Sequence, residues 1–351
     1  MMDILMGTGL LVIVLGLFTL FSYKAPNGMK AMGALANAAC ASFLVEAFHS
    51  AFLGGVFNIE FLKGVGDANG SLGGVAAAIL VPLALGVSPG YAVLTGLAVA
   101  EFGILPGFFA GYVVAYVVKF LEKKVPAGLD LIVIILTCAP LARLVATVMQ
   151  PVVDGTLLKI GQVLLSATNA SPIIMGIILG GMITVVATAP LSSMALTAML
   201  GLTGTPMAIG ALAVFGSSFM NYVFFNKMKF GSKKDTIAVA IEPLTQADII
   251  SANPLPVYVT NFIGGAMSGV IIALMGLTNM TPGTATPIAG LAIMFAYNEP
   301  VKVLITATGC AAVSVLGGFI GYALFKNKKI KTAAEIRGEV VESLNSAELA
   351  A

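Results

Sequence analysis

The sequence of 351 residues has little charge, no tryptophan and a single histidine. Asp, Glu, Lys and Arg make up 10% of it, against roughly 25% in a soluble domain, so it lacks the charged shell that a soluble core needs. One histidine excludes a His-rich metal site, and the three cysteines lie in separate apolar segments without CxxC spacing. We therefore expect no metal, no cofactor and no catalytic residue of its own. The net charge of +2 gives no sign of nucleic-acid binding.

Hydrophobic residues make up 58% of the chain, and its mean hydropathy is +1.02. This composition indicates an all-α polytopic membrane protein embedded in a lipid bilayer, with about 10 transmembrane helices. The first apolar run, Ile4 to Tyr23, is followed by its positive charges rather than preceded by them, so we expect a membrane helix there and not a signal peptide. Apolar spans lie near 4–23, 31–56, 71–88, 90–118, 130–150, 172–200, 204–226, 255–278 and 285–325.

Several of these spans are interrupted by proline and glycine. The breaks near Pro106, across 172–226 and across 281–300 predict two re-entrant hairpins in the C-terminal half, or kinked but continuous helices. Residues 151–170 place apolar side chains at helical spacing, which indicates an amphipathic helix along the interface or a tilted membrane helix.

Lysine clusters at 119–124, 227–234 and 326–331 indicate that these three segments face the cytoplasm. We expect residues 331–351 to form a polar cytoplasmic tail.

Ionisable groups inside apolar runs are candidate functional residues because they are costly in lipid. Glu46 and His49 share one helix face and would bind a proton or the solute, or His49 bonds to a backbone carbonyl or to Glu46. Glu101 precedes a break, and Arg143 lies in the span 130–150. We expect both to serve in structural ion pairs or hydrogen bonds, with solute or proton binding as the alternative.

The stretch MFAYNEPVKVLI contains the strongest candidate, Glu299. Pro300 after it removes a backbone donor and disfavours helical geometry at Glu299. A carboxylate beside such a break could accept hydrogen bonds from sugar hydroxyls, and Asn298 adds a donor and an acceptor. The alternative is a structural ion pair of Glu299 with Lys302 or Arg143.

A second polar stretch, ATAPLSSMALTAML at 187–200, could form a hairpin tip. Thr188, Ser192 and Ser193 would then line a cavity, or their hydroxyls would bond back to their own helix. Asn221 is a weaker binding candidate in the following span.

The order of several features along the chain resembles a known family. These features are PGFFAGYVVAYVVKFLEKKVP, the helix with Arg143, the segment MQPVVDGTLLKIGQVLLSATNASPIIMGIILGGMI, a proline-broken hairpin and NEPV. This order is similar to the membrane-embedded IIC subunit of the bacterial phosphotransferase system, glucose-type superfamily. PLSSMALTAMLGLTGTPMAIGA resembles the compact IIC-like branch that includes perfringolysin-regulator-like membrane proteins. The resemblance covers roughly 100–325.

The resemblance implies a homodimeric multi-pass permease of the bacterial inner membrane that moves a sugar. A scaffold at 1–150 would carry the dimer contact, and a transport domain at 171–330 would move like an elevator. Separate IIA and IIB proteins would supply the phosphoryl group, and Glu299 would hold the sugar.

Family members often carry a histidine in the first hairpin, where this chain reads TAPLSSM. Transport without phosphorylation, coupled to a proton or ion, therefore stays an alternative, as does a membrane-embedded sensor.

Overall fold

The computed structural model describes residues 2–126, 128–189 and 193–337. Every regular element within them is a helix, and the one extended pairing is an isolated bridge between Gly204 and Asn279. The all-helical class expected from the composition is therefore confirmed.

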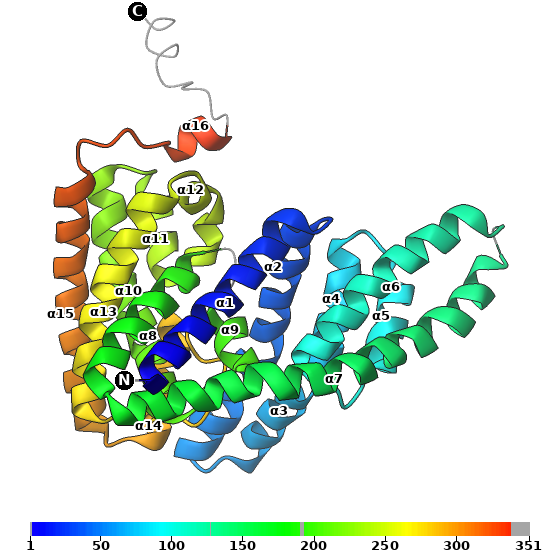
Figure 1. Cartoon of the computed structure of the whole chain (residues 1–351), viewed down its shortest axis with the longest axis horizontal. Coiled ribbons are helices and arrows are strands. Elements are labelled where there is room, and N and C mark those ends of the chain that lie inside the picture. Colours follow the sequence, from blue (N-terminus) through cyan, green and yellow to red (C-terminus); the bar gives the residue numbers. More distant parts are fainter. Residues whose placement is uncertain (1, 127, 190–192, 338–351) are drawn as a thin grey trace, which may run out of the picture.

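The helices gather into two lobes that α7 connects (Figure 1). The first lobe is built around α2, α4, α5 and α6, with a π-helical stretch that continues α2 (Figure 1). Proline, glycine or a polar turn separates most of its helices. The elements are α1 (Met2–Lys24), α2 (Gly28–Ala39), the π-helices η1 (Cys40–Leu44) and η2 (Ala47–Val56), α3 (Glu60–Ser71), α4 (Gly73–Ala84), α5 (Pro89–Ala98), α6 (Ile104–Lys124) and α7 (Asp130–Ala170).

The second lobe packs α8, α10, α13 and α15 side by side and carries shorter helices at its ends and centre (Figure 1). Four of its helices begin with proline at the first turn, where the missing N–H costs nothing. The elements are α8 (Pro172–Thr188), α9 (Ser193–Met199), α10 (Gly204–Met228), α11 (Lys233–Ile241), the 3₁₀ helix η3 (Pro243–Gln246), α12 (Ala247–Ala252), α13 (Pro254–Met275), α14 (Pro287–Tyr297), α15 (Pro300–Phe325) and α16 (Ala333–Arg337).

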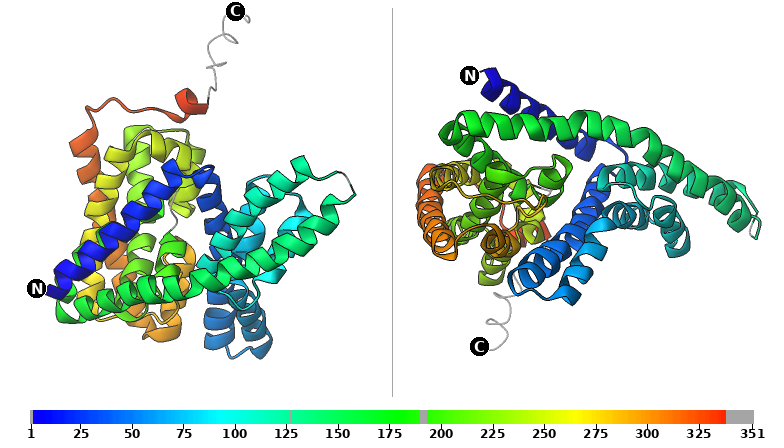
Figure 2. Two further views of the ribbon diagram at one scale, coloured as in Figure 1. Left: turned by 45° about the vertical axis from the view of Figure 1, so that its right-hand side comes forward. Right: turned by 90° about the horizontal axis from the view of Figure 1, so that it is seen from below.

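Helix α7 is 41 residues long and stays helical through Pro140 and Pro151. At 1.5 Å per residue it extends about 60 Å, and it runs past both lobes (Figure 2). The separate helix expected at 151–170 is therefore the second half of one continuous element, and the expected domain boundary near residue 150 falls inside it. The position of this half along the membrane interface stays a prediction.

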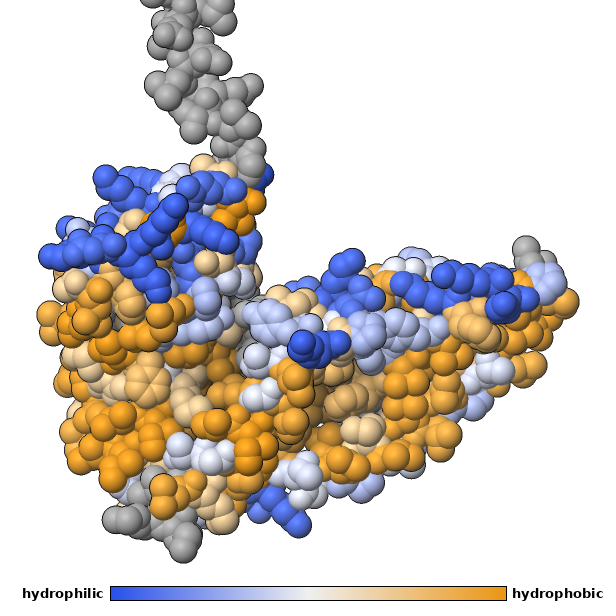
Figure 3. Space-filling model, turned by 45° about the horizontal axis from the view of Figure 1, so that its top comes forward, coloured by the Kyte–Doolittle hydropathy of each residue, from blue (hydrophilic) through white to orange (hydrophobic). Residues whose placement is uncertain are grey.

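Seven helices in the described residues are long and apolar enough to cross a membrane, or up to eight if the bent pair α3 and α4 forms one span. This is below the expected count because α8 and α14 are shorter apolar helices and α7 is unbroken. Hydrophobic surface covers the sides of both lobes beneath a hydrophilic cap over the lysine-rich end (Figure 3). The chain is thus a multi-pass membrane protein, and re-entry of its hairpins stays a prediction.

Glycines allow α8 and α13 to pack backbone against backbone. A Cβ on Gly180 would overlap the carbonyl oxygen of Gly265, and a Cβ on Gly269 would overlap that of Gly176. Helices that associate in lipid gain most from such close approach, because neither helix is driven together by water. This pair holds the centre of the second lobe.

The π-helical stretch brings the first lobe against the centre of the second. Helix α14 packs on η2, and Phe43 of η1 lies beside Gly283, where the backbone has φ +77°. A Cβ at Gly283 would also lie 3.1 Å from the Ala198 side chain of α9. Such π-turns are rare and occur often at functional sites. The contact places both lobes next to the candidate site.

Candidate functional site

Two hairpins meet inside the second lobe. In the first, α8 ends at Thr188 and α9 begins at Ser193; in the second, an irregular segment over 277–286 precedes α14. The Ser193 hydroxyl at one tip donates to the Ala285 carbonyl at the other over 2.6 Å. At their other ends, Gly204 and Asn279 exchange two backbone hydrogen bonds of 2.8 and 3.1 Å. The two hairpins are thus joined at both ends.

A small cavity lies between the two tips, and one carboxylate reaches it from a third direction. Glu242 and Pro243 enter from the junction of α11 and η3, on the lysine-rich side of the lobe. The other lining residues are Ala187, Ser193, Met194, Val214, Ala285, Thr286 and Pro287. The half-buried Glu242 supplies the site's acidic group, and the hydroxyls of Ser193 and Thr286 its neutral polar groups.

The cavity has a volume of about 10 Å³, enough for a single water molecule. Pockets that hold small ligands measure roughly 300–1,000 Å³. The described arrangement is therefore closed, and a sugar can enter only if the hairpin tips and the Glu242 segment separate. The Ser193–Ala285 hydrogen bond is the contact between the tips that such opening would break.

Glu242 was not among the residues singled out from the sequence. It lies between the lysine cluster at 227–234 and the apolar span at 255–278, outside the apolar runs in which ionisable groups were sought. Yet Glu242-Pro243 repeats the dipeptide of Glu299-Pro300, the only signal that could have drawn attention to it.

Asn298 and Glu299 lie at the open end of the second hairpin, away from the cavity. The Asn298 side chain accepts from the Thr278 N–H at 2.9 Å and donates to the Thr278 and Met294 carbonyls at 2.7 and 2.9 Å. It therefore ties the two arms of the hairpin together. Glu299 occupies the N-cap position of α15 without a capping hydrogen bond from its side chain, is exposed, and makes no ion pair among the described residues. The sequence-based prediction that Glu299 binds the sugar therefore competes with Glu242, which lines the cavity.

Replacing Asn298 with alanine should lower the melting temperature of the detergent-solubilised protein. The change leaves the Thr278 N–H and carbonyl without their partner, a loss worth about 1–3 kcal/mol when such groups are buried. Thr308→Ala is the matched control, since Thr308 is exposed on α15 and bonds only to Leu304 of its own helix. Equal melting temperatures for the two variants would contradict the structural role of Asn298.

The other hydroxyl and amide candidates divide between the hairpin tips and the helix interior. Thr188 is buried and bonds back to Val185 of its own helix at 2.8 Å. Ser193 lines the cavity, whereas Ser192 lies outside the described residues. Asn221 is fully buried between α10 and α13, where its side-chain oxygen accepts from Asn261 at 2.9 Å.

The ionisable candidates of the first lobe do not line the cavity. The His49 ring nitrogen Nδ1 lies 3.1 Å from the Val45 carbonyl oxygen, one turn earlier. Glu46 packs against Gly70 of α3, near the 2.6 Å hydrogen bond from Ser50 to Asp67. Both sit where η2 meets α3, so the structure does not bring them to the hairpin tips.

Arg143 and Glu101 lie beside each other at the turn between α5 and α6. The Arg143 guanidinium is 3.5 Å from the Glu101 carboxylate and donates to the Ala98 and Ala100 carbonyls at 3.4 and 3.1 Å. It also stacks over the Phe102 ring, 4.8 Å from the ring centre. Glu101 itself has φ +75°. Arg143 thus binds the carbonyls of a strained turn.

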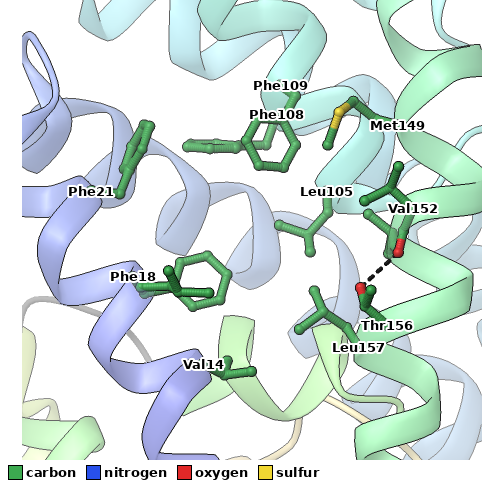
Figure 4. Close-up of a pocket in the computed structure, with 12 residues that line it drawn as sticks. Val14, Phe18, Phe21, Leu105, Phe108, Phe109, Met149, Val152, Thr156 and Leu157 are labelled. Carbon is green, nitrogen blue, oxygen red and sulfur yellow. Dashed lines mark hydrogen bonds between the residues drawn. The ribbon is translucent and has the colours of Figure 1, made fainter. Parts of the chain in front are cut away.

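A larger cavity of about 300 Å³ lies between α1, α6 and α7 and is lined by apolar and aromatic side chains (Figure 4). The one hydroxyl on its wall, that of Thr156, donates to the Val152 carbonyl at 2.6 Å. A polar solute would lose its hydrogen bonds to water there without replacing them. The small cavity at the hairpin tips is therefore the better candidate for a polar solute.

Binding sites of many membrane transporters are built from interrupted helices at the centre of a helical bundle, and the two hairpins of this chain have that arrangement. The family model described as "Phosphotransferase system, EIIC" matches residues 29–337. The chain belongs to this family, and the expected resemblance is confirmed.

A curated relative is the "PTS system fructose-specific EIIB'BC component" of Haemophilus influenzae (strain ATCC 51907 / DSM 11121 / KW20 / Rd). It is 28% identical over 192 residues, which cover 51% of this chain and 33% of the relative. The matched region is thus about a third of that relative's length.

Proposed function

We propose that this chain admits a hexose as the EIIC permease of a phosphotransferase system, with fructose as the first candidate. Family membership supports the permease, and the name of the Haemophilus relative supports fructose and an EIIB partner. The position of Glu242 between both hairpin tips is the observation that carries the proposed site.

Glu242 suits a sugar because a carboxylate accepts hydrogen bonds from two hydroxyls and has no proton of its own to offer. Ser193 and Thr286 on the opposite walls can each donate or accept. A site that hydrogen-bonds hydroxyls rejects analogues that lack them, since its own polar groups would be left unpaired. We propose Glu242 as the principal sugar ligand, with Ser193 and Thr286 as the groups that orient the ring.

The route of entry supports a phosphoryl-transfer partner on the cytoplasmic side. Glu242 reaches the cavity from the segment beside the lysine-rich cap. The sugar hydroxyl that it binds therefore faces the side from which separate IIA and IIB proteins would deliver a phosphoryl group. We further propose a homodimer in the bacterial inner membrane, with the second lobe moving against the first to carry the sugar across.

The function can be tested with purified protein in liposomes. Fructose, mannose, glucose and N-acetylglucosamine are first compared by thermal shift, and the sugar that stabilises the protein most is then used for uptake. We expect accumulation of sugar phosphate only when IIA, IIB and a phosphoryl donor are present inside. Accumulation of the free sugar without a donor would instead establish the phosphorylation-independent alternative, and no response to any sugar would contradict the proposed function.

A further inference from the structure

The C-terminal helix α16 ends in an arginine that contacts three side chains of another segment. Arg337 Nη1 lies 2.7 Å from Asp235 Oδ1, and its Nε lies 2.7 Å from Asp248 Oδ2. Its Nη2 donates to the Gln246 side-chain oxygen at 2.8 Å and to the second Asp248 carboxylate oxygen, Oδ1, at 3.2 Å. The Arg337 and Asp235 side chains are only 30% and 13% exposed, so water shields this network incompletely.

The chain before Arg337 is fastened to the same end of the lobe. The Asn253 side chain donates to the Lys331 carbonyl and accepts from the Lys331 N–H, each at 2.8 Å. The Ala333 N–H donates to the Phe230 carbonyl at 2.7 Å, and the Ala333 side chain is buried. Ala333 and Ile336 join an apolar cluster with Phe224, Phe225, Phe230, Val239, Ile249 and Ile250. These contacts of residues 331–336 therefore hold Arg337 at a defined position.

The residues that Arg337 contacts enclose Glu242 in the sequence. Asp235 lies in the first turn of α11, Glu242 directly follows this helix, Gln246 ends η3, and Asp248 lies in the first turn of α12. Arg337 thus connects the two ends of the segment 235–248, and Glu242 lies in the middle of this segment. Glu242 in turn reaches the hairpin tips together with Pro243.

We propose that Arg337 is a positioning residue for the sugar site, holding the segment 235–248 closed so that Glu242 stays between the hairpin tips. This inference rests on the proposed function of Glu242. The C-terminal helix then acts on a site it does not touch.

The chemistry of this contact requires arginine. Its planar group presents five donors in a fixed fork, which allows two hydrogen bonds to Asp248 together with one each to Asp235 and Gln246. Lysine would supply the charge but not this geometry.

These carboxylates are also ionised at neutral pH. Burial alone would raise the pKa of Asp235, but hydrogen bonds from Ser232 and Arg337 lower it below its ordinary value. The hydrogen bond from Arg337 is the main cause that lowers the pKa of Asp248. Since both pKa values are depressed, the two carboxylates stay ionised, and the contact persists, to a lower pH than ordinary aspartates would allow.

The test compares Arg337→Gln with Lys331→Gln in the full-length protein. Both remove one positive charge from the same segment, but Lys331 is anchored through its backbone and keeps those bonds. Two quantities are measured: the dissociation constant of the sugar found by thermal shift, and amide hydrogen exchange over 233–252. Arg337→Lys serves as the conservative variant, and Glu242→Gln/Arg337→Gln completes a double-mutant cycle.

Arg337→Gln should weaken sugar binding by about three- to thirtyfold, which lies within the range of coupling between residues in one network. It should also accelerate exchange over 233–252, whereas Lys331→Gln should do neither and Arg337→Lys should recover part of the loss. In the Glu242→Gln background, Arg337→Gln should have little further effect, because its action passes through Glu242.

Faster exchange without weaker binding would overturn the positioning role, as would an equal loss in the Glu242→Gln background. Unchanged exchange would overturn it as well and leave the proposed function standing. If the wild type bound none of the sugars, the proposed function itself would fail. The two failures are distinguishable, because the exchange data test only the positioning role of Arg337.

Discussion

Glu242→Gln should weaken sugar binding on the order of a hundredfold, while Glu299→Gln should leave it within about twofold. A hydrogen bond to a buried charged group contributes about 1.5–3 kcal/mol, and each 1.4 kcal/mol corresponds to a factor of about ten in affinity. Glutamine keeps the size of glutamate but replaces one acceptor oxygen with a donor. It would therefore oppose a sugar hydroxyl that donates to the carboxylate.

The two variants form a matched pair because each glutamate precedes a proline in the same lobe. They differ in place: Glu242 lines the cavity at the hairpin tips, whereas Glu299 is exposed at the start of α15. Isothermal titration with the sugar chosen by thermal shift measures both. The reverse result, a large loss for Glu299→Gln and none for Glu242→Gln, would return the sugar to the NEPV motif and remove it from the hairpin tips.

Gly269→Ala should strongly reduce the yield of folded protein and lower its melting temperature. The new methyl group would overlap the carbonyl oxygen of Gly176 and approach Gly180, so α8 and α13 would have to separate. Overpacking typically costs about 1–3 kcal/mol, and backbone in a helix pair cannot move aside as a flexible side chain can. Because α8 also carries the first hairpin, the loss of this contact should disturb the cavity.

Gly309→Ala on α15 is the control for that substitution. The nearest neighbours of a methyl group there are atoms of Ile271 at 3.7 Å, an ordinary van der Waals distance. Alanine also favours helix over glycine by about 1 kcal/mol. The control should therefore be neutral or slightly stabilising. Size-exclusion profiles and thermal melts of both proteins give the comparison, and similar behaviour of the two would show that the close approach of α8 and α13 is unimportant.

Composition and hydrophobic pattern predicted an all-helical membrane protein, because a chain embedded in lipid needs long apolar segments and few charges along most of its length. The family also followed from the order of local features, such as the long apolar runs and the NEPV motif. The length of α7 did not, since Pro140 and Pro151 look like helix ends until neighbouring groups are known. Continuity of a helix through proline depends on its surroundings.

The candidate site shows the same limit more sharply. Glu299 stands out in the sequence because it lies within a long apolar run, whereas Glu242 lies outside the apolar spans, between the lysine cluster at 227–234 and the span at 255–278. Which carboxylate faces an enclosed cavity depends on how the α11–η3 segment folds back toward the hairpins, and no local pattern contains that information. Arg143 and Glu101 were both expected in structural contacts, but that they contact each other required the relative placement of α5 and α7.

Helix α7 has a mechanical consequence. It runs past both lobes as one rod, and the helical backbone is interrupted only where it passes into α8, at Ser171 with φ −149° and ψ 78°. A rod of this length turns a small rotation at that joint into a displacement of several ångströms at its far end. Rotation of the second lobe about Ser171 would therefore move the hairpin tips along an arc. The proposed sugar site would then shift across the membrane and tilt in a single motion.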